Sequence, residues 1–576
     1  MTIKKIALIH SSNKNYSESQ NYGLKFAPVW AFVLSTYIKE RGHYSELYDL
    51  NVNENSIVEI ADAYFFSGIN QDLSSIIDIA KYIKLKFPQV PLYIGGPIAW
   101  SFDQAGELDQ LNIFDHICIG DGEILVTKIL EALEGDINLP HVFKIIDRFD
   151  LSKSLTMDEE LIERSYKNYY GAVIEVSRGC PFLCEFCDIR VLPDNNRSHN
   201  RSVEVIISEL DIYRRLGIRN IQFACDNFIG ELPWANELVE AIIKYNRENN
   251  FSPSFYTWLT INVASYEELL KKMRIAGFDN LFIGVESFES NTLMETAKLQ
   301  NTKFELIESI TNIQSYGFVV VAGLIFGFDS DSDKSFDITL QGITSTGLLS
   351  GDASLLTALP GTPLFRRMRL SGRLRNFQHD ALLGGHKYVT NIKYLMDSDK
   401  IIEGYINFSQ KFLDGEYQYA RIGKFYSIII TRGNLININR PGYTNLGAFL
   451  AKALKSPTLL FFHLVRMLPL LKPKAIFYLF KALALSVHMK FKYNIGLQYF
   501  IFWLFIWVNA LNKYGKISKN DFNIESVPYN FDYERLVPVG YLEQADEKIP
   551  QKMINAQYKA TVKQLERIIK INKATT

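Results

Sequence analysis

The stretch SRGCPFLCEFCDIR, residues 177–190, decides how this chain folds around its chemistry. Its three cysteines, Cys180, Cys184 and Cys187, follow the spacing C-x3-C-x2-C. Cysteine thiolates are the usual protein ligands of iron–sulfur clusters, and four of them fill the four irons of a cubane. Three thiolates leave one iron open to another molecule. The sequence therefore predicts a [4Fe–4S] cluster with one reactive iron.

Zinc, a disulfide and buried thiols are the alternative interpretations. A closed zinc site needs four ligands, and the other two cysteines, Cys118 and Cys225, are distant in sequence. Five cysteines in 576 residues are too few for a disulfide framework. The cluster is the favoured interpretation because the flanking segments support it independently.

The charge and the first residues of the chain limit which partners and which cell compartment we expect. The formal net charge of -1 gives no support for nucleic-acid binding. The start, MTIKKIALIHSSNK, has an apolar run too short for a signal peptide and is better read as a buried strand. We therefore expect a protein of the reducing cytoplasm, and the length allows three domains.

Residues 1–146 alternate short apolar strands with helical patterns, which predicts a flavodoxin-like α/β domain with a parallel sheet. Three predicted strands end in glycine or serine. Glycine lets the backbone approach a large ligand, although single glycines of this kind are more often plain turns. The candidate ligand-binding residues at these ends are Ser67, Gly95, Gly96, Gly120 and Glu123.

A charged linker from about Asp147 to Lys167 leads to residues 168–371, which repeat strand and helix six times. Six such units predict a partial (β/α)6 TIM-type barrel, with its chemistry at the carboxyl ends of the strands. Polar residues and glycines fall at those ends. The candidates there are Asp226, Glu286, Ser287, Gly323 and Gly327.

The cysteine motif and the barrel together resemble the radical S-adenosylmethionine (SAM) enzymes. The resemblance implies that SAM binds the open iron and is cleaved to a 5′-deoxyadenosyl radical. It places Phe186 near the adenine, Asp226 at the SAM amino group, Glu286 with Ser287 at the ribose, and the Gly323 to Gly327 backbone at the adenine. A helix cap for Asp226 and an ion pair for Glu286 are the structural alternatives.

The first domain resembles the cobalamin-binding domain found in one branch of that family. The D-x-H-x-x-G signature that supplies a cobalt-ligating histidine is missing, since Asp115 and His116 are adjacent and do not fit it. The resemblance thus implies cobalamin held without a histidine ligand. A vestigial, empty domain is the alternative.

Residues 372–576 predict a mostly helical extension, whose first part resembles that of the hopanoid methylases. Within it, residues 495–511 read IGLQYFIFWLFIWVNAL. Trp503 and Trp507 are one turn apart and should share a helix face. A buried helix and an interfacial, membrane-contacting helix are both open interpretations, and a transmembrane span is the least favoured.

These resemblances imply a cobalamin-dependent C-methyltransferase that acts on an unactivated carbon of a hydrophobic or secondary-metabolite substrate. A cyclase or rearrangement enzyme with the same cofactors, and a non-catalytic cofactor-binding or regulatory protein, are the alternatives. The expected partners are a small-molecule or lipid substrate and an electron donor such as flavodoxin or ferredoxin. We expect the protein in the cytoplasm, with contact at the inner face of the membrane if residues 495–511 are interfacial.

Overall fold

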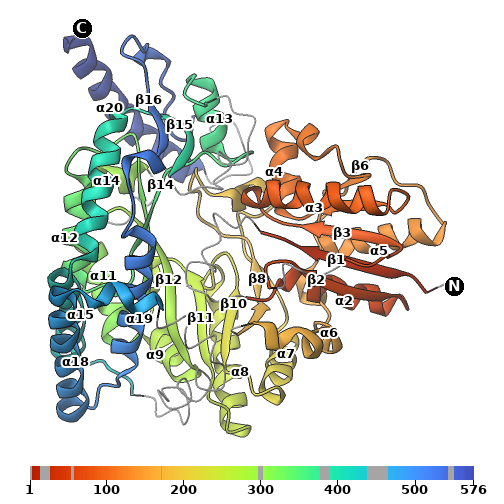
Figure 1. Cartoon of the computed structure of the whole chain (residues 1–576), viewed down its shortest axis with the longest axis horizontal. Helices are drawn as coiled ribbons and strands as arrows, with labels where there is room; N and C mark the ends of the chain where they lie inside the picture. The colour runs from red at the N-terminus through yellow and green to blue at the C-terminus, as the bar shows by residue number, and fades with distance from the viewer. Residues whose placement is uncertain are drawn as a thin grey trace.

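The computed structural model contains two parallel sheets and a largely helical third region (Figure 1). The N-terminal sheet lies on the right of Figure 1, the second sheet in the centre and the C-terminal helices on the left. The description covers residues 3–12, 26–52, 58–169, 171–295, 303–375, 388–437, 465–541 and 551–575.

The first sheet is doubly wound, as the sequence predicts. Its strands run parallel in the order β2-β1-β3-β4-β5-β6. They are β1 (Lys5–His10), β2 (Tyr44–Asp49), β3 (Ala63–Ser67), β4 (Leu92–Gly95), β5 (His116–Ile119) and β6 (Val142–Lys144).

Helices cover both faces of this sheet, because its strands are apolar on both sides. Along β1, Ile6 and Leu8 belong to one buried cluster, while Ala7 and Ile9 belong to another. Helices α2 (Val29–Glu40) and α5 (Gly122–Glu134) supply the first cluster, and α3 (Leu73–Lys86) and α4 (Pro97–Ala105) supply the second. The carboxyl ends of the strands are thus left for a ligand.

The second sheet has six parallel strands in chain order, which confirms the predicted partial barrel. The strands are β7 (Ala172–Glu175), β10 (Asn220–Ala224), β11 (Ser254–Leu259), β12 (Phe278–Glu286), β13 (Val319–Phe326) and β14 (Asp352–Leu355). The helices that follow them are α7 (Val203–Arg215), α8 (Leu232–Glu248), α9 (Glu267–Ala276), α10 (Ser290–Glu295), α11 (Lys303–Ser315), α12 (Ser335–Thr346) and α13 (Pro363–Leu370).

The segment predicted as a linker is packed against the protein. It contains α6 (Glu159–Ser165), and its Met157 and Leu161 are buried. The Ser35 hydroxyl of α2 donates to the Asp158 carboxylate at 2.5 Å. This segment therefore ties the first sheet to the barrel.

The third region is mostly helical, as predicted. It holds β15 (Val389–Tyr394), α14 (Ser398–Leu413), α15 (Gly415–Arg432), α18 (Pro473–Tyr493), α19 (Gln498–Tyr514), β16 (Asn523–Ser526) and α20 (Gln551–Thr575). Helix α15 packs over α11 and α12, and α18 packs over α15. Among the described helices, none is both long and apolar enough to cross a bilayer.

Helix α19 buries the two tryptophans that the sequence places on one face. Trp503 and Trp507 are both fully buried, and their indole N–H groups donate to the carbonyls of Gln418 and Leu413 at 3.0 Å. For this face of α19, the buried-helix interpretation is the one that the structure supports.

Candidate functional site: the cluster loop and the edges of two sheets

The three cysteines lie on a loop between β8 (Ser177–Arg178) and the turn at Asp188–Val191. Gly179 begins the loop with φ of +91°, and a side chain there would collide with the carbonyl of Arg197. The Cys180 amide donates to the carbonyl of Asn195 at 2.9 Å. Only glycine fits this close approach, which fixes where the loop starts.

The thiols are half-buried and electrostatically coupled. Burial raises the pKa of Cys180 to about 11, and burial with nearby Asp188 and Cys184 raises that of Cys187. Their thiolates therefore need a cationic partner, such as cluster iron, to form at neutral pH.

No group of three or more His, Cys, Asp or Glu in the described ranges has the spacing for one metal ion. Thiolates on a cubane each bind a different iron, so they lie further apart than the ligands of a single ion.

Asp226 and Asn227, which follow β10, lie beside this loop. The Gly179 amide donates to the Asp226 carboxylate at 2.6 Å, and burial raises the pKa of Asp226 to about 6. Helix α8 begins at Leu232, so Asp226 is not its cap. Within the described part of the chain, the buried Nδ2 of Asn227 has no partner at full hydrogen-bond geometry, and the Asn227 side chain lies close enough to the Cys180 thiol to favour its thiolate.

Glu286 ends β12 in a backbone conformation that is rare for a side-chain-bearing residue. Its φ is +62°, and the register between β12 and β13 shifts between Gly284 and Glu286. Such conformations cost roughly 1–3 kcal/mol and gather at functional sites. The adjacent Ser287 hydroxyl accepts the Glu289 amide at 3.0 Å, so it holds the turn.

Phe186 lies at the turn that ends β13. Its ring meets Phe328 edge to face, with centroids 6.0 Å apart. Gly327 has φ of +102°, and a Cβ there would lie 2.5 Å from the Tyr394 ring; a Cβ at Gly323 would lie 3.0 Å from Phe282. The structure thus brings Phe186 to the glycine strand, as the resemblance implies.

A buried ion network holds the cluster loop against α13. Glu185, between two of the cysteines, accepts two hydrogen bonds from Arg367, whose Nη1 also donates to Asp329 at 2.9 Å. Burial opposes ionisation of Asp329, yet the guanidinium groups of Arg373 and Arg367 hold its pKa below its ordinary value. Sequence reasoning missed this network, because its members are up to 188 residues apart.

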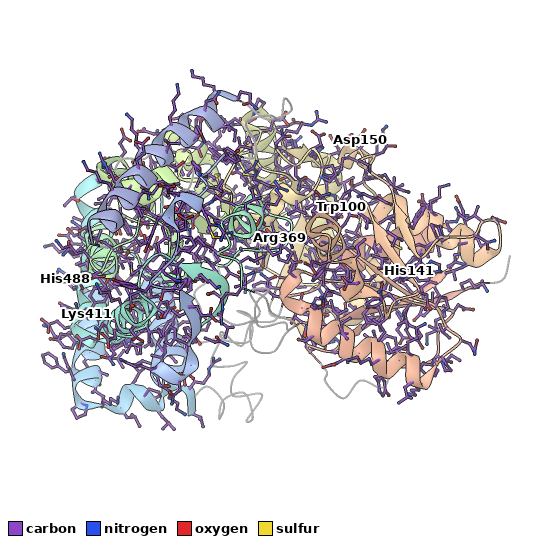
Figure 2. The ribbon with its side chains drawn as sticks, turned by 90° about the horizontal axis from the view of Figure 1, so that it is seen from above. Trp100, His141, Asp150, Arg369, Lys411 and His488 are labelled. Atoms are coloured by element: carbon purple, nitrogen blue, oxygen red, sulfur yellow. The ribbon has the colours of Figure 1, made fainter. Side chains whose placement is uncertain are left out.

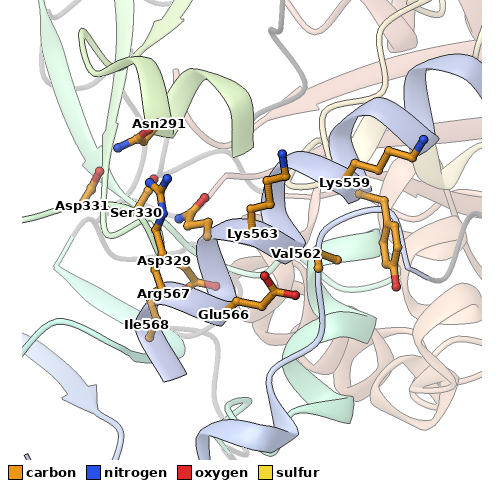
Figure 3. A pocket seen from close by; sticks show the side chains of 12 residues that line it. Asn291, Asp329, Ser330, Asp331, Lys559, Val562, Lys563, Glu566, Arg567 and Ile568 are labelled. Atoms are coloured by element: carbon orange, nitrogen blue, oxygen red, sulfur yellow. The ribbon is translucent and has the colours of Figure 1, made fainter. Parts of the chain in front are cut away.

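The same turn borders a cavity of about 790 Å³ beneath α20 (Figure 3). Asp329 and Asp331 line it from the barrel, and Lys563, Glu566 and Arg567 line it from α20. Helix α20 thus returns to the carboxyl end of β13, where the resemblance places the adenine.

The glycine edge of the first sheet faces the cluster loop through an ion cluster. Arg178, next to Gly179, donates to Glu123 at 2.7 Å and to Glu175 at 2.8 Å. Glu123 therefore pairs with Arg178 of the barrel domain, and its contact with cobalamin stays a prediction. Arg148 donates to Asp121 and to Asn195, each at 2.8 Å, and adds a second tie between the sheet and the loop.

The predicted strand-end residues pack closely at this edge. A Cβ on Gly96 would collide with the Ser67 hydroxyl, and one on Gly120 would lie 2.8 Å from the Ile145 carbonyl. Gly95 ends β4 beside Ser67, its partner in β3. Side chains larger than glycine would therefore not fit at Gly96 and Gly120 without movement of their neighbours.

Three polar side chains at this edge have buried atoms without a hydrogen-bond partner in the described chain. They are Asn70 Oδ1 and Gln71 Oε1, after β3, and Trp100 Nε1, in α4. Helix α4, which carries Trp100, ends at α13, where Arg369 donates to the carbonyl of Ala105 at 3.2 Å; Figure 2 labels Trp100 and Arg369 near the middle of the molecule. Buried polar groups without partners are rare in native proteins and call for a ligand or water. Sequence reasoning missed all three.

Aromatic residues on alternate positions of the barrel strands form a further set that the sequence analysis did not select. Phe223 stacks on Phe228, which contacts Trp234 of α8, so this side of the sheet faces the helices. Half-buried residues point to the other side, inside the barrel. They include Tyr256, Trp258 and Phe282.

Comparison with known proteins defines the class first. Residues 174–342 match the Radical SAM superfamily. The chain therefore carries a radical SAM domain, which implies a [4Fe–4S] cluster and SAM.

Two hopanoid methylases are among the relatives. The chain is 31% identical over 346 residues to the hopanoid C-2 methylase of Rhodopseudomonas palustris. This alignment covers 59% of this chain and 62% of the relative. It is 26% identical to the hopanoid C-3 methylase of Methylococcus capsulatus, over 58% of this chain and 67% of the relative. The chain thus spans less than two thirds of the first of these relatives.

Solved structures share the fold. The cobalamin-dependent radical enzyme OxsB, with aqua-cobalamin and SAM bound, has a TM-score of 0.56 at 15% identity and covers 97% of this chain and 84% of its own. The methyltransferase TsrM of Kitasatospora setae has a TM-score of 0.53 at 14% identity, over 65% of this chain and 77% of its own. This chain has the fold of the cobalamin-dependent radical SAM enzymes and is related to the hopanoid methylases.

Proposed function

We propose that this protein is a cobalamin-dependent radical SAM C-methyltransferase that acts on an unactivated carbon of a hydrophobic substrate. The observation that carries the proposal is the direct contact between the cluster loop and the carboxyl edge of the first sheet. Arg178 adjoins the loop and binds Glu123 in the turn after β5. Two cofactors bound at these edges would meet above the barrel, where proximity contributes most to a radical transfer.

The residues of the first sheet suit a corrin with its many amide side chains. Asn70 and Gln71 offer buried acceptors and Trp100 a buried donor. Gly95, Gly96 and Gly120 allow close approach of the ligand to the backbone. Cobalamin, when bound, would supply the methyl group, and the role of this chain's residues is to hold and orient it.

Histidine ligation of cobalt is disfavoured by the contacts of His10, at the carboxyl end of β1. Burial lowers the pKa of His10, so its imidazole is neutral and has one lone pair. The Trp30 indole donates to Nδ1 of His10 at 3.4 Å and uses that lone pair. We expect the electron paramagnetic resonance spectrum of bound cob(II)alamin to show no histidine nitrogen, and to be unchanged in His10→Ala.

At the barrel, each residue has a binding or orienting role. Cys180, Cys184 and Cys187 would hold the cluster, and Asn227 would donate to the ligand on the open iron. Asp226, which receives the Gly179 amide, would orient the SAM amino group, while Glu286 would receive the ribose hydroxyls. Phe186, with the Gly323 to Gly327 strand, would flank the adenine.

The lining of the barrel supports an apolar substrate. Tyr256, Trp258 and Phe282 present aromatic surface to the inside of the sheet, where burial of apolar substrate is favourable. The cluster would receive electrons from an external donor such as flavodoxin or ferredoxin. A lipid substrate would also agree with contact between the enzyme and the inner face of the membrane.

Anaerobic incubation with SAM, a reductant, cobalamin and a lipid extract tests the proposal. We expect 5′-deoxyadenosine and a product heavier than its substrate by one methylene, detected by mass spectrometry. A product of unchanged carbon number would favour a cyclase or rearrangement enzyme instead. Failure of the reconstituted protein to cleave SAM would favour a non-catalytic protein.

A further inference from the structure

Helix α18 exposes a largely apolar stripe that is interrupted by one histidine. Phe477, Phe480 and Phe491 are 57%, 64% and 86% exposed, and Ala484 and His488 lie between them on the same side. The spacing 477, 480, 484, 488, 491 follows one face of a helix. At 1.5 Å per residue, this α18 face is about 21 Å long.

The opposite side of α18 explains why the stripe is turned outward. Ala482, Ser486 and Met489 are buried, and the Tyr426 hydroxyl of α15 donates to Ser486 at 3.0 Å. Figure 1 shows α18 at the outer edge of the molecule, and Figure 2 shows His488 at the side far from His141 of the first domain. Leu468 and Leu471, 56% and 64% exposed, extend the apolar surface beyond the start of the helix.

The charged residues in the sequence around α18 are all basic. Between Glu416 and Asp521 the chain has no Asp or Glu, whereas the average of the whole chain would give about 11 in that length. The same stretch contains 15 Lys and Arg. On or next to α18 these are Lys472, Lys474, Lys481, Lys490 and Lys492.

We propose that the α18 face lies on an anionic lipid bilayer and holds the protein at the membrane surface. Exposed phenylalanines would enter the acyl boundary, while lysines would meet the acidic headgroups. A second copy of the chain is a poor occupant, because a symmetric contact would place lysines opposite lysines. The tryptophan face of α19 is not the contact, since Trp503 and Trp507 are buried.

This surface would leave the catalytic edges open. In Figure 1, α18 and the first sheet lie on opposite sides of the barrel. Attachment through α18 would not cover the cluster loop, which faces the first sheet through Arg178 and Glu123. The inference concerns attachment alone and holds whether or not the protein transfers a methyl group.

Flotation of the full chain with phosphatidylcholine vesicles, with and without phosphatidylglycerol, tests the inference. We expect binding to the anionic vesicles that weakens as salt rises. Phe477→Ser/Phe480→Ser/Phe491→Ser should lower the partition coefficient at least about tenfold, and Lys490→Gln/Lys492→Gln should lower it less. Leu85→Ser, at an 87% exposed position on α3, is the matched control and should bind like the wild type.

Because the substituted side chains are exposed, circular dichroism should show that all variants fold. Equal binding of wild type and triple variant would overturn the inference, as would equal binding to neutral and anionic vesicles or no binding by the wild type. Light scattering adds a separate check. A wild-type dimer that the triple substitution converts to a monomer would assign the α18 face to a second copy.

Discussion

At the scale of single residues, the cysteines divide into two groups with different expected roles. Cys180, Cys184 and Cys187 share the loop, whereas Cys118 is buried in the first sheet and Cys225 Sγ lies 3.3 Å from the Thr257 hydroxyl. Alanine at any loop cysteine should abolish SAM cleavage, because three thiolates are the fewest that hold the cluster. Cys118→Ala and Cys225→Ala should keep a full iron content and produce 5′-deoxyadenosine.

Glu286 offers a second test at this scale. Its strained backbone would suit glycine, so Glu286→Gly removes the carboxylate without a steric conflict. We expect at least about a tenfold rise in the Kd of SAM, since hydrogen bonds to a charged group contribute roughly 1.5–3 kcal/mol. Calorimetry on the reconstituted protein measures it.

Asn250→Gly is the matched control for Glu286→Gly. Asn250 has a φ of +47° and follows α8 at the other end of the barrel. The Asn250→Gly substitution should leave the Kd of SAM unchanged. If Glu286→Gly itself binds SAM with unchanged affinity, Glu286 does not bind SAM, and its strained backbone has a structural role.

At the scale of elements, α13 holds the cluster loop in place through Arg367. This guanidinium is 3% exposed and binds Glu185 and Asp329. Arg367→Met would remove the Arg367 counter-ion from buried Glu185, while Asp329 would keep its pair with Arg373. Breaking a buried ion pair in this way typically costs about 3–5 kcal/mol. We expect a lower Tm and a lower iron content after reconstitution.

Arg369→Met, on the same helix, is the control. Arg369 is half-exposed and pairs with Glu107 at 3.1 Å, and surface pairs contribute about 1 kcal/mol or less. A full iron content in Arg367→Met would show that the loop needs no support from α13.

Helix α19 gives a prediction about stability. Trp503→Ala should lower the free energy of unfolding by about 3–5 kcal/mol, because it empties a fully buried site and removes a hydrogen bond. Ile501→Ala, at a 38% exposed position, should cost less than about 1 kcal/mol. Urea denaturation measures both, and equal losses would contradict the assignment of the buried face.

The strands and helices of the barrel were predictable from the sequence, whereas one strand and one helix of the first domain were missed. The barrel strands are apolar runs such as VVVAGLIF, which stand out from the helices between them. Strand β2, YSELYD, was missed because it lies at the edge of the sheet and carries charged residues. Helix α4 was missed because it has only nine residues and begins at Pro97, directly after a glycine pair, a pattern typical of a turn.

The candidate site was predictable only where chemistry is local in sequence. The cysteine spacing and the strand-end glycines lie within short motifs. In the structure, Phe186 contacts Phe328 and Asp226 contacts the loop at Gly179, and their predicted roles toward SAM stay predictions. The ion-pair partners of Glu123 and Glu185 are Arg178 and Arg367. They come from other elements of the fold, so no short sequence motif reveals these pairs. The assigned roles and domain boundaries remain predictions for experiment.

At the scale of the whole molecule, Arg178 joins the two sheets. Arg178→Met would remove the cation that pairs with both Glu123 and Glu175, and with it the ion pair between the first sheet and the barrel. We expect weaker retention of cobalamin on gel filtration and faster proteolysis between the first sheet and the barrel. Lys153→Met, which removes an exposed pair with Asp150, should change neither property.

The return of α20 to the carboxyl end of β13 has a consequence for biosynthesis. About 180 residues separate α13 from α20, and a ribosome that adds roughly 5–20 residues per second needs about 10–40 s to make them. During that interval the barrel can fold while the cavity at Asp329 still lacks its α20 wall. In nascent chains, Asp329 and Asp331 at the carboxyl end of β13 would therefore stay uncovered until the last helix is made and docks over them.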